Sequence, residues 1–260
     1  MKGIEPSSQQ ATPGLTRKIA DFWTRNVNAE RLFGRSVSAH PRGSDGYFAD
    51  LEAQRYRTHR HLPPWIASMT PGRSVLEVGS GIGLDSWRMA SSGLEVTAID
   101  LTTVGAATAA ARFARNGRPA RFAAADAGSL PFPDASFDYV YSFGVLHHAA
   151  DTARCIDEVR RVLRPGGEAL IMLYHRRSLN ELVHRIMRVP FEEKDELCPV
   201  VRRYTRDEVR ELFRDYASVD VHADYLFGEG YGALYRWFPD FLYRPLSRWI
   251  GWHLMIRAVR

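Results

Sequence analysis

Lysine is nearly absent from this sequence. It occurs only at Lys2, Lys18 and Lys194, and the other basic residues, out of 35 in all, are arginines. The arginines are scattered along the chain, and together with 30 acidic residues they leave a formal net charge of +5. Surfaces that bind nucleic acids gather basic residues in blocks with interleaved aromatics. The scatter therefore argues against a nucleic-acid partner.

Cysteine and long hydrophobic runs are also scarce. The two cysteines, Cys155 and Cys198, lack the spacing of a metal site. The first residues, MKGIEPSSQQATPG, lack the apolar segment of a secretory signal, and no apolar run approaches the length of a membrane span. A chain of 260 residues that is 45% hydrophobic and 25% charged is expected to fold in water. We expect a reducing, cytoplasmic setting.

The N-terminal quarter has few strand signals. Residues 1–14 are rich in Ser, Gln, Pro and Gly, which predicts a mobile tail. Apolar residues at helical spacing predict helices over residues 15–27 and 47–65, with Pro63 and Pro64 ending the second. We therefore expect a helical cap over residues 15–70.

From residue 74 short apolar runs alternate with helical stretches. Five runs predict strands: SVLEVG, LEVTAID, ARFAAAD, FDYVYSFG and EALIMLY. Helices are expected between them, and the alternation predicts a parallel sheet with right-handed crossovers, which is a doubly wound α/β core. After Tyr174 the alternation loosens, with helices near residues 178–187 and 205–216 and two further strands in SVDVHADYLF and WHLMIRAV.

A glycine-rich turn follows the first of these strands. In a doubly wound sheet ligands bind outside the carboxyl ends of the strands, and Gly79, Gly81 and Gly83 lie at such an end. Glycine permits positive φ and lets a ligand approach the main chain. A dinucleotide fingerprint, G-x-G-x-x-G, would need a glycine where Leu84 stands. The observed spacing, G-x-G-x-G, is by itself also compatible with a tightly packed turn.

Acidic residues end the next two strands. LEVTAID ends in Asp100, where a carboxylate can accept hydrogen bonds from both hydroxyls of a ribose, and ARFAAAD ends in Asp126. The glycine turn contains no lysine or arginine. This pattern favours a ligand with a ribose and a positive centre over one with phosphates. S-adenosylmethionine has these properties.

The motifs LEVGSGIG, AID, ADAGSLPF, FDYVYSFGVLHH and LRPGG together resemble the class I S-adenosylmethionine-dependent methyltransferases. Within this family the motifs are similar to those of the small-molecule group that includes the ubiquinone and menaquinone methyltransferases. The resemblance implies a Rossmann-like, seven-stranded, mostly parallel sheet over residues 71–260, with helical insertions at 176–204 and 227–251. It also implies S-adenosylmethionine as cofactor and S-adenosylhomocysteine as product.

The resemblance assigns roles around the cofactor. Glu77 and the glycine turn face its methionine part, Asp100 the ribose, Asp126 the adenine amino group, and the end of the fourth strand its amino group. The implied cofactor residues are Glu77, Gly79, Ser80, Gly81, Gly83, Asp100, Leu101, Asp126, Ala127, Ser142 and Phe143. Alternatively, a lone Asp at a strand end caps the next helix, and Glu77 pairs with an arginine. Gly166 in LRPGG fits a turn with positive φ, which is a structural role.

Methyl transfer needs an acceptor held in line with the sulfonium and, for a protic acceptor, a base. His147 and His148 follow the fourth strand directly and are the candidate catalytic residues; helix capping and packing are the alternative. Further acceptor candidates lie on the N-terminal helices and after the fifth strand: Tyr47, Phe48, Arg55, Tyr56, Tyr174 and His175. No set of Asp, Asn and Glu at this edge suggests a magnesium site, so we predict no metal.

The segment LYRWFPDFLYRPLSRWIG is amphipathic, with an aromatic face and several arginines. Pro245 is expected to kink or split it. A helix pair packed on the sheet is the favoured interpretation. The alternatives are a lid over a hydrophobic acceptor, a homodimer contact, or an interfacial helix at a membrane surface. The aromatics favour an apolar or aromatic small-molecule acceptor.

The leading functional hypothesis is a methyltransferase acting on a small metabolite, in biosynthesis. One alternative is a cyclase-like enzyme that retains the cofactor, and another is a catalytically silent cofactor-binding subunit. Leu84 counts against a nicotinamide-dependent oxidoreductase. The segment SFGVLHH replaces the motif that protein and nucleic-acid methyltransferases use on exocyclic amines, which argues against them.

Overall fold

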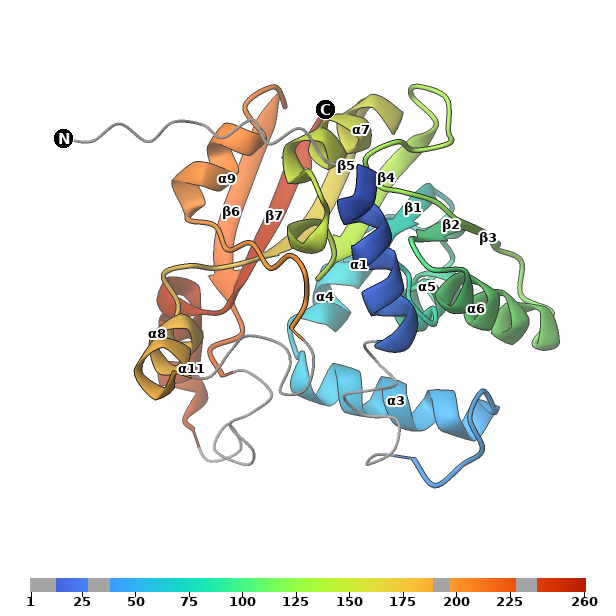
Figure 1. The fold of residues 1–260 in the computed structure, drawn as a ribbon, viewed down its shortest axis with the longest axis horizontal. Coiled ribbons are helices and arrows are strands. Elements are labelled where there is room, and N and C mark those ends of the chain that lie inside the picture. Colours follow the sequence, from blue (N-terminus) through green and yellow to red (C-terminus); the bar gives the residue numbers. More distant parts are fainter. Residues whose placement is uncertain (1–12, 28–37, 189–196, 228–237) are drawn as a thin grey trace.

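In the computed structural model, which describes residues 13–27, 38–188, 197–227 and 238–260, the strands form one seven-stranded sheet (Figure 1). Its order is β3-β2-β1-β4-β5-β7-β6. β7 runs antiparallel to both neighbours, and the other pairs are parallel. The strands are β1 (Ser74–Val78), β2 (Glu95–Asp100), β3 (Arg121–Ala124), β4 (Phe137–Phe143), β5 (Leu163–Tyr174), β6 (Ser218–Asp224) and β7 (His253–Val259). The predicted mostly parallel, doubly wound α/β fold is confirmed.

Helices alternate with the strands as the sequence pattern predicts. They are α1 (Pro13–Arg25), α3 (Asp45–Thr58), α4 (Leu62–Ala67), α5 (Leu84–Ser91), α6 (Thr103–Arg115), α7 (Thr152–Val162), α8 (Leu179–Met187), α9 (Arg206–Leu212) and α11 (Asp240–Ile250), with the 3-10 helix η2 (Leu146–His148). Several begin at a side chain that accepts a hydrogen bond from the first turn, such as Thr102 before α6 and Asp151 before α7. Thr205 and Glu208 form a complete capping box at α9.

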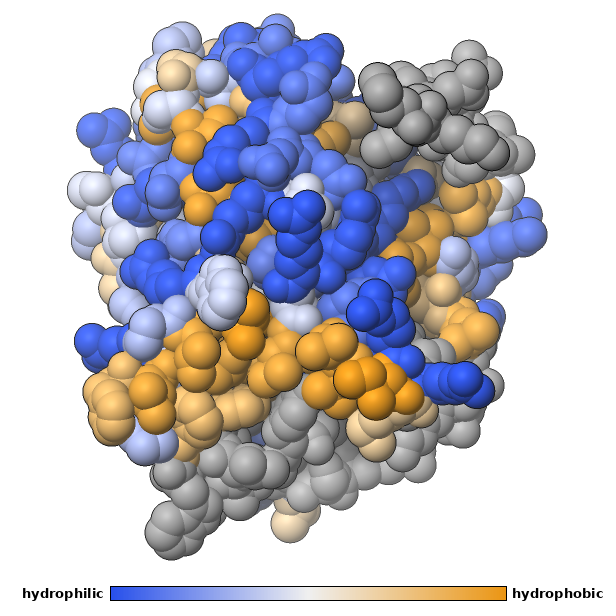
Figure 2. Space-filling view, turned by 90° about the vertical axis from the view of Figure 1, so that its left-hand side faces the viewer, coloured by the Kyte–Doolittle hydropathy of each residue, from blue (hydrophilic) through white to orange (hydrophobic). Residues whose placement is uncertain are grey.

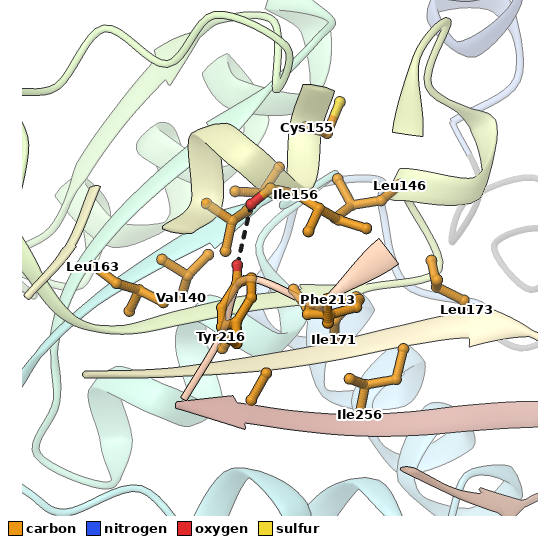
Figure 3. Packing of buried hydrophobic residues seen from close by; sticks show 14 of the residues in the cluster. Val140, Leu146, Cys155, Ile156, Leu163, Ile171, Leu173, Phe213, Tyr216 and Ile256 are labelled. Atoms are coloured by element: carbon orange, nitrogen blue, oxygen red, sulfur yellow. Dashed lines mark hydrogen bonds between the residues drawn. The ribbon is translucent and has the colours of Figure 1, made fainter. Parts of the chain in front are cut away.

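Two hydrophobic layers cover the two faces of the sheet. On one face α7 and α9 pack against alternate residues of the central strands, and Figure 3 shows this cluster with the Tyr216 hydroxyl donating to the Ile156 carbonyl at 3.1 Å. On the other face Ile66 and Met89, from α4 and α5, pack against the intervening residues, among them Val75 and Tyr141. Because strand side chains alternate between faces, apolar runs such as SVLEV fill both layers.

The break between α3 and α4 corrects the prediction of one helix over residues 47–65. α3 ends at Thr58, and Pro63 and Pro64 lie in the first turn of α4. Proline is tolerated there because the first N–H groups of a helix have no intrahelical partner. The prolines therefore start a helix, and the linker of residues 59–61 leaves two histidines at the edge of the sheet.

Some predicted features lie outside the described residues. These are the tail up to residue 12, residues 189–196 of the insertion 176–204, and residues 228–237 of the insertion 227–251. The division into a tail, a helical cap at residues 15–70 and a domain from residue 71 stays a prediction.

Gly166 has φ +76°, as its turn position predicts. Among the described helices, none combines the length and the apolar character needed to cross a bilayer.

Candidate functional site

The predicted cofactor residues meet at one edge of the sheet. The parallel strands β1, β2 and β4 end there, and the structure brings their carboxyl ends side by side through the β1 pairings with β2 and β4. The hydroxyl of Ser142, at the end of β4, donates to the Val78 carbonyl at the end of β1 at 3.0 Å. Residues distant in the sequence thus form one continuous rim, as expected for parallel strands.

The glycine turn runs from Val78 into α5 with all three glycines at positive φ. The angles are +82° at Gly79, +50° at Gly81 and +79° at Gly83. A Cβ at Gly79 would come within 2.3 Å of Val145, and one at Gly83 within 2.8 Å of Ala109. A Cβ at Gly81 would meet no atom within 4 Å. The first and last glycines therefore serve packing, whereas Gly81 faces open space.

Asp100 holds this turn in place. Its Oδ2 accepts a hydrogen bond from the Gly81 N–H at 2.8 Å, and its Oδ1 accepts from the N–H and the hydroxyl of Thr102 at 2.8 and 2.7 Å. Sequence reasoning assigned Asp100 to a ribose and missed this link. A carboxylate has about four lone-pair sites, so three protein donors leave one for a ligand hydroxyl.

The other predicted cofactor residues lie around the same rim. Asp126 is exposed beyond the end of β3, and its Oδ1 accepts from the Gly128 N–H at 2.9 Å. Leu101 and Ala127, which follow Asp100 and Asp126 in the chain, are half-buried. Phe143 ends β4 and is half-buried among aromatic side chains. All of these residues are placed where the motif predicts, and their roles toward a cofactor stay predictions.

Two observations test whether the rim fits a nucleoside ligand. The Ser80 hydroxyl is buried and has no hydrogen-bond partner among the described residues. Buried hydroxyls are ordinarily paired, so this one has capacity for a ligand. Gly81 presents main chain to open space, which a side chain would fill. The residues present therefore fit the ligand that the motif implies.

A buried charge network lies under the turn. Asp85, in the first turn of α5, accepts hydrogen bonds from the Nε and Nη2 of Arg55 at 2.8 and 2.5 Å. The hydroxyls of Tyr56 and Tyr141 also donate to it, at 3.0 and 2.9 Å. Arg55 and Tyr56 were predicted at the acceptor, and the structure engages both of them with Asp85. Their acceptor role stays a prediction, and sequence reasoning missed Asp85 and Tyr141.

Glu77 and Asp85 both lie in this network, and their pKa values are shifted in opposite directions. Burial raises the pKa of Glu77 well above its usual value, and the nearby Asp85 carboxylate raises it further; the Ser86 hydroxyl donates to its Oε2. Burial alone would also raise the pKa of Asp85, but the Arg55 guanidinium and the donated hydrogen bonds outweigh it and lower that pKa. Asp85 is therefore the ionised partner of Arg55, while Glu77 tends to hold a proton.

The two predicted catalytic histidines differ in their surroundings. His147 is fully buried, and neither ring nitrogen has a hydrogen-bond partner among the described residues. Its ring lies 3.8 Å from that of Tyr174, and burial lowers its pKa well below the usual value. His148 instead has its Nδ1 2.7 Å from the Val200 carbonyl. That contact requires His148 to donate from Nδ1, which makes it an anchor for the segment around Val200.

The remaining acceptor candidates are packed among aromatic and backbone groups. The Tyr174 ring stacks on Trp252, with ring centroids 4.3 Å apart. His175 is buried with its Nδ1 2.9 Å from the Gly251 carbonyl. Tyr47 is buried in a separate small cluster beside the glycine turn, together with Phe48. The structure thus brings Tyr174 next to His147 and leaves Tyr47 apart from them.

A group of rings at the same edge was not predicted from the sequence. It comprises His59, His61, Phe143, Tyr225 and His253, and we call it the ring cluster. His61 Nε2 lies 3.0 Å from His253 Nδ1, and Tyr225 stacks on both His59 and His253 at 4.6 and 4.5 Å. Burial lowers the pKa of His61 to about 4. These imidazoles are therefore neutral near pH 7, and in the chain that the structure describes no three such groups are arranged to hold a metal ion.

The only sequence signal for the ring cluster was weak. Histidines interrupt otherwise apolar segments at WHLMIRAV and RHLPPW, and a lone histidine on an apolar face is usually a packed core residue. The pairing register of β7 shows which residues lie beside His253, and the sequence alone does not. Tyr174, Asp224 and His253 share one row of the sheet, because β7 pairs antiparallel with β5 and β6.

Comparisons with known proteins agree with this geometry. Residues 76–171 match the family described as methyltransferase domain. The 27-O-demethylrifamycin SV methyltransferase of Amycolatopsis mediterranei is 37% identical over 128 residues, which are 47% of each chain. A probable S-adenosylmethionine-dependent methyltransferase of Mycobacterium tuberculosis is 31% identical over 172 residues, 66% of this chain and 58% of that protein. The chain spans about half the length of the curated relatives that it matches.

Solved structures show the same fold at low identity. The [4+2]-cyclase SpnF has a TM-score of 0.60 at 20% identity, covering 94% of this chain and 96% of the cyclase. An S-adenosylmethionine-dependent methyltransferase of Methanosarcina mazei has a TM-score of 0.56 at 21% identity, covering 74% and 94%. The arrangement of sheet and helices is that of class I methyltransferases.

Proposed function

We propose that the protein transfers the methyl group of S-adenosylmethionine to a small, apolar or aromatic metabolite. The match of residues 76–171 to the family described as methyltransferase domain supports this proposal. The observation that carries the proposal is the turn itself. Gly81 turns main chain toward open space at positive φ, while Asp100 fixes its N–H and the buried Ser80 hydroxyl lacks a partner among the described residues. A nucleoside with a cationic methionine part has the groups to fill these positions.

The residues around the turn bind and orient the cofactor in this proposal. Asp100 accepts a ribose hydroxyl at its remaining lone pair, and Asp126 accepts from the adenine amino group. Glu77 lies under the methionine end, where its carboxyl group faces the amino group. Bound there, the cofactor supplies a methyl group on a sulfonium. Displacement from a sulfonium needs no Lewis acid, and the proposal includes no metal ion.

The acceptor side is formed by His147, Tyr174 and the ring cluster. These side chains lie at or just beyond the ends of β4 and β5, beside the predicted position of the methyl group. Aromatic faces suit an apolar or aromatic acceptor. His147 is neutral and has ring nitrogens unpaired among the described residues, so it can take the proton of a hydroxyl or amino acceptor as the new bond forms. Relatives named for a rifamycin and a phytyl hydroquinone support a small-molecule acceptor.

A cytoplasmic location is also part of the proposal. Cys155 and Cys198 are both free thiols. Free thiols are usual in reducing compartments, which supports a cytoplasmic location.

The test compares two glycines with similar backbone angles, of which only Gly81 lies in the proposed cofactor site. Gly81 and Gly117 have φ of +50° and +60°, and a Cβ at either meets nothing within 4 Å. An alanine at such an angle costs roughly 1–2 kcal/mol at both sites. We expect Gly81→Ala to weaken S-adenosylmethionine and S-adenosylhomocysteine binding at least about tenfold by calorimetry, because its methyl group enters the cofactor space. Gly117→Ala should bind as the unaltered protein does.

Asp100→Ala provides a second arm, with Asp220→Ala, at an exposed position of β6, as its control. Loss of binding in Asp100→Ala alone would support the cofactor site. Binding that is unchanged in both Gly81→Ala and Asp100→Ala, or absent from the folded unaltered protein, would contradict the proposal. A screen of acceptors with mass detection then separates the alternatives: a methylated product supports transfer, an isomerised product indicates a cyclase-like enzyme, and binding without turnover indicates a silent subunit.

A further inference from the structure

Helices α8 and α11 present apolar side chains to solvent. Figure 1 places both at one corner of the molecule, in the lower left of the view. Figure 2 looks at this side and shows hydrophobic side chains gathered in one band with hydrophilic ones beside it. The exposed apolar face of the two helices comprises Leu182, Ile186, Met187, Phe241, Leu242 and Trp249.

The exposure of this face is unusual for large side chains. Phe241 and Trp249 are 75% and 70% exposed, and Ile186 is 70% exposed. In α11 the residues Phe241, Pro245 and Trp249 follow one another at a spacing of four, which puts them on a single stripe. Contiguous exposed apolar surface on a soluble protein ordinarily marks an interaction site.

Arginines flank the apolar face. Arg185 and Arg188 lie on or after α8, and Arg244 and Arg248 lie on α11. Among the described residues none of the four forms an ion pair, whereas Glu181 on α8 is paired with Arg203 at 3.4 Å. The face therefore combines protruding aromatic and aliphatic side chains with four arginines that pair with no carboxylate among the described residues.

The charge decides between the occupants of this face. A symmetric contact between two copies would bring each set of arginines close to its equivalent and would leave the like charges to repel. An anionic lipid surface accepts both features, because phosphates pair with arginine while phenylalanine and tryptophan enter the boundary between headgroups and acyl chains. The net charge of +5 adds long-range attraction to such a surface.

We propose that the exposed apolar face of α8 and α11 docks the protein on membranes that contain anionic phospholipids. α11 leads through Gly251 into Trp252, which stacks on Tyr174. On the basis of the proposed function, docking would bring the bilayer next to the acceptor side chains and would favour a lipid-soluble acceptor. The docking itself does not depend on methyl transfer.

The test is sedimentation of the full chain with vesicles, without cofactor or acceptor. One vesicle preparation is phosphatidylcholine alone, and the other mixes it with phosphatidylglycerol. We expect binding to the mixed vesicles at low salt and at least about tenfold weaker binding at high salt, because salt screens charges on the arginines. Phe241→Ser/Trp249→Ser and Arg244→Gln/Arg248→Gln should each weaken binding about tenfold or more. The substituted side chains lie outside the core, so the variants should keep the melting temperature of the unaltered protein.

The control removes the same charge from another helix. Arg210→Gln/Arg214→Gln, on and just after α9, changes two exposed arginines that already pair with acidic neighbours, so vesicle binding should stay within about twofold. The proposal is wrong if the folded protein does not bind mixed vesicles, or if the α9 variant loses as much binding as the α11 variants. A dimer that Phe241→Ser/Trp249→Ser abolishes, without vesicle binding, would instead assign the face to a second copy. None of these outcomes bears on cofactor binding, which the Gly81 experiment measures.

Discussion

His147 shows how a single buried side chain can indicate function. Its imidazole is fully buried, with both nitrogens unpaired among the described residues, and it lies against Tyr174 and His148. A buried polar group without a partner destabilises the folded state, typically by about 1–3 kcal/mol. A purely structural residue at this position would more readily be apolar. The unpaired nitrogens are accounted for if the partner is an acceptor.

This argument predicts opposite effects on stability and on turnover. His147→Phe keeps a ring against Tyr174 and removes the unpaired nitrogens, so the melting temperature should stay equal or rise. With a protic acceptor identified by screening, kcat should fall about 100-fold to 10,000-fold, because the base is lost. Cofactor affinity, measured by calorimetry, should stay unchanged. A destabilised variant with unchanged kcat would show that the ring serves packing alone.

Glu77 should make stability depend on pH. Its pKa in the folded protein is raised well above the usual value, so the folded state binds a proton that the unfolded chain releases. Glu77 therefore stabilises the folded state fully at pH values below its pKa in the unfolded chain. This stabilisation is lost as the pH rises toward its higher pKa in the folded protein. The pKa of Asp85 is lowered, so Asp85 stabilises the folded state at higher pH, and this stabilisation is lost in a more acidic range as the pH falls.

We expect Glu77→Gln to flatten this dependence. The substituted amide would keep an uncharged side chain beside Ser86, so urea midpoints between about pH 5 and pH 8 should decline less steeply than in the unaltered protein. Glu95→Gln, on an exposed position of β2, is the matched control and should leave the slope unchanged. Parallel slopes for Glu77→Gln and the unaltered protein would show that Glu77 is ionised in the folded state.

At the scale of elements, the Arg55–Asp85 pair fastens α3 to α5. The guanidinium makes two hydrogen bonds to the carboxylate, and Asp85 is 3% exposed. Removing one member of a buried pair leaves the other without compensation. We expect Arg55→Met to lower the free energy of unfolding by about 3–5 kcal/mol in urea titrations.

Two further variants sharpen this measurement. Arg55→Met/Asp85→Leu removes both charges and should recover part of the loss. Arg57 lies on the same helix, but its side chain is exposed. Arg57→Met should therefore change the free energy of unfolding by no more than about 0.5 kcal/mol. If Arg55→Met and Arg57→Met cost the same, the pair does not fasten the helices.

The elements themselves were largely predictable from the sequence. β1 and β4 are short apolar runs bounded by turn residues, and such runs can fill both layers of a covered sheet. The division of residues 47–65 was not predicted, because Pro63 and Pro64 stop a helix that precedes them and equally start one that follows. Only the tertiary position of residues 59–61 decides between the two.

At the scale of the whole molecule, the sequence predicted one side of the site better than the other. The cofactor rim depends on contiguous motifs, in which Gly79 to Gly83 and Asp100 lie at the ends of adjacent strands. The ring cluster depends on side chains from distant parts of the chain, since His61 and His253 are 192 positions apart. No local pattern records such a contact. The antiparallel register of β7 places His253 at this edge beside Tyr174, and the break between α3 and α4 brings His61 to it.

The position of β7 has a consequence for the order in which the protein can be assembled. β7 lies between β5 and β6, and among the described strands β6 has no other neighbour. While a ribosome is still adding residues 253–259, β6 has an unpaired edge and His253 is missing from the ring cluster. Domains form as cooperative units, and unpaired edges favour aggregation. A nascent chain would therefore form the β1–β2–β4 rim first, and the ring cluster would be completed only once residues 253–259 had followed.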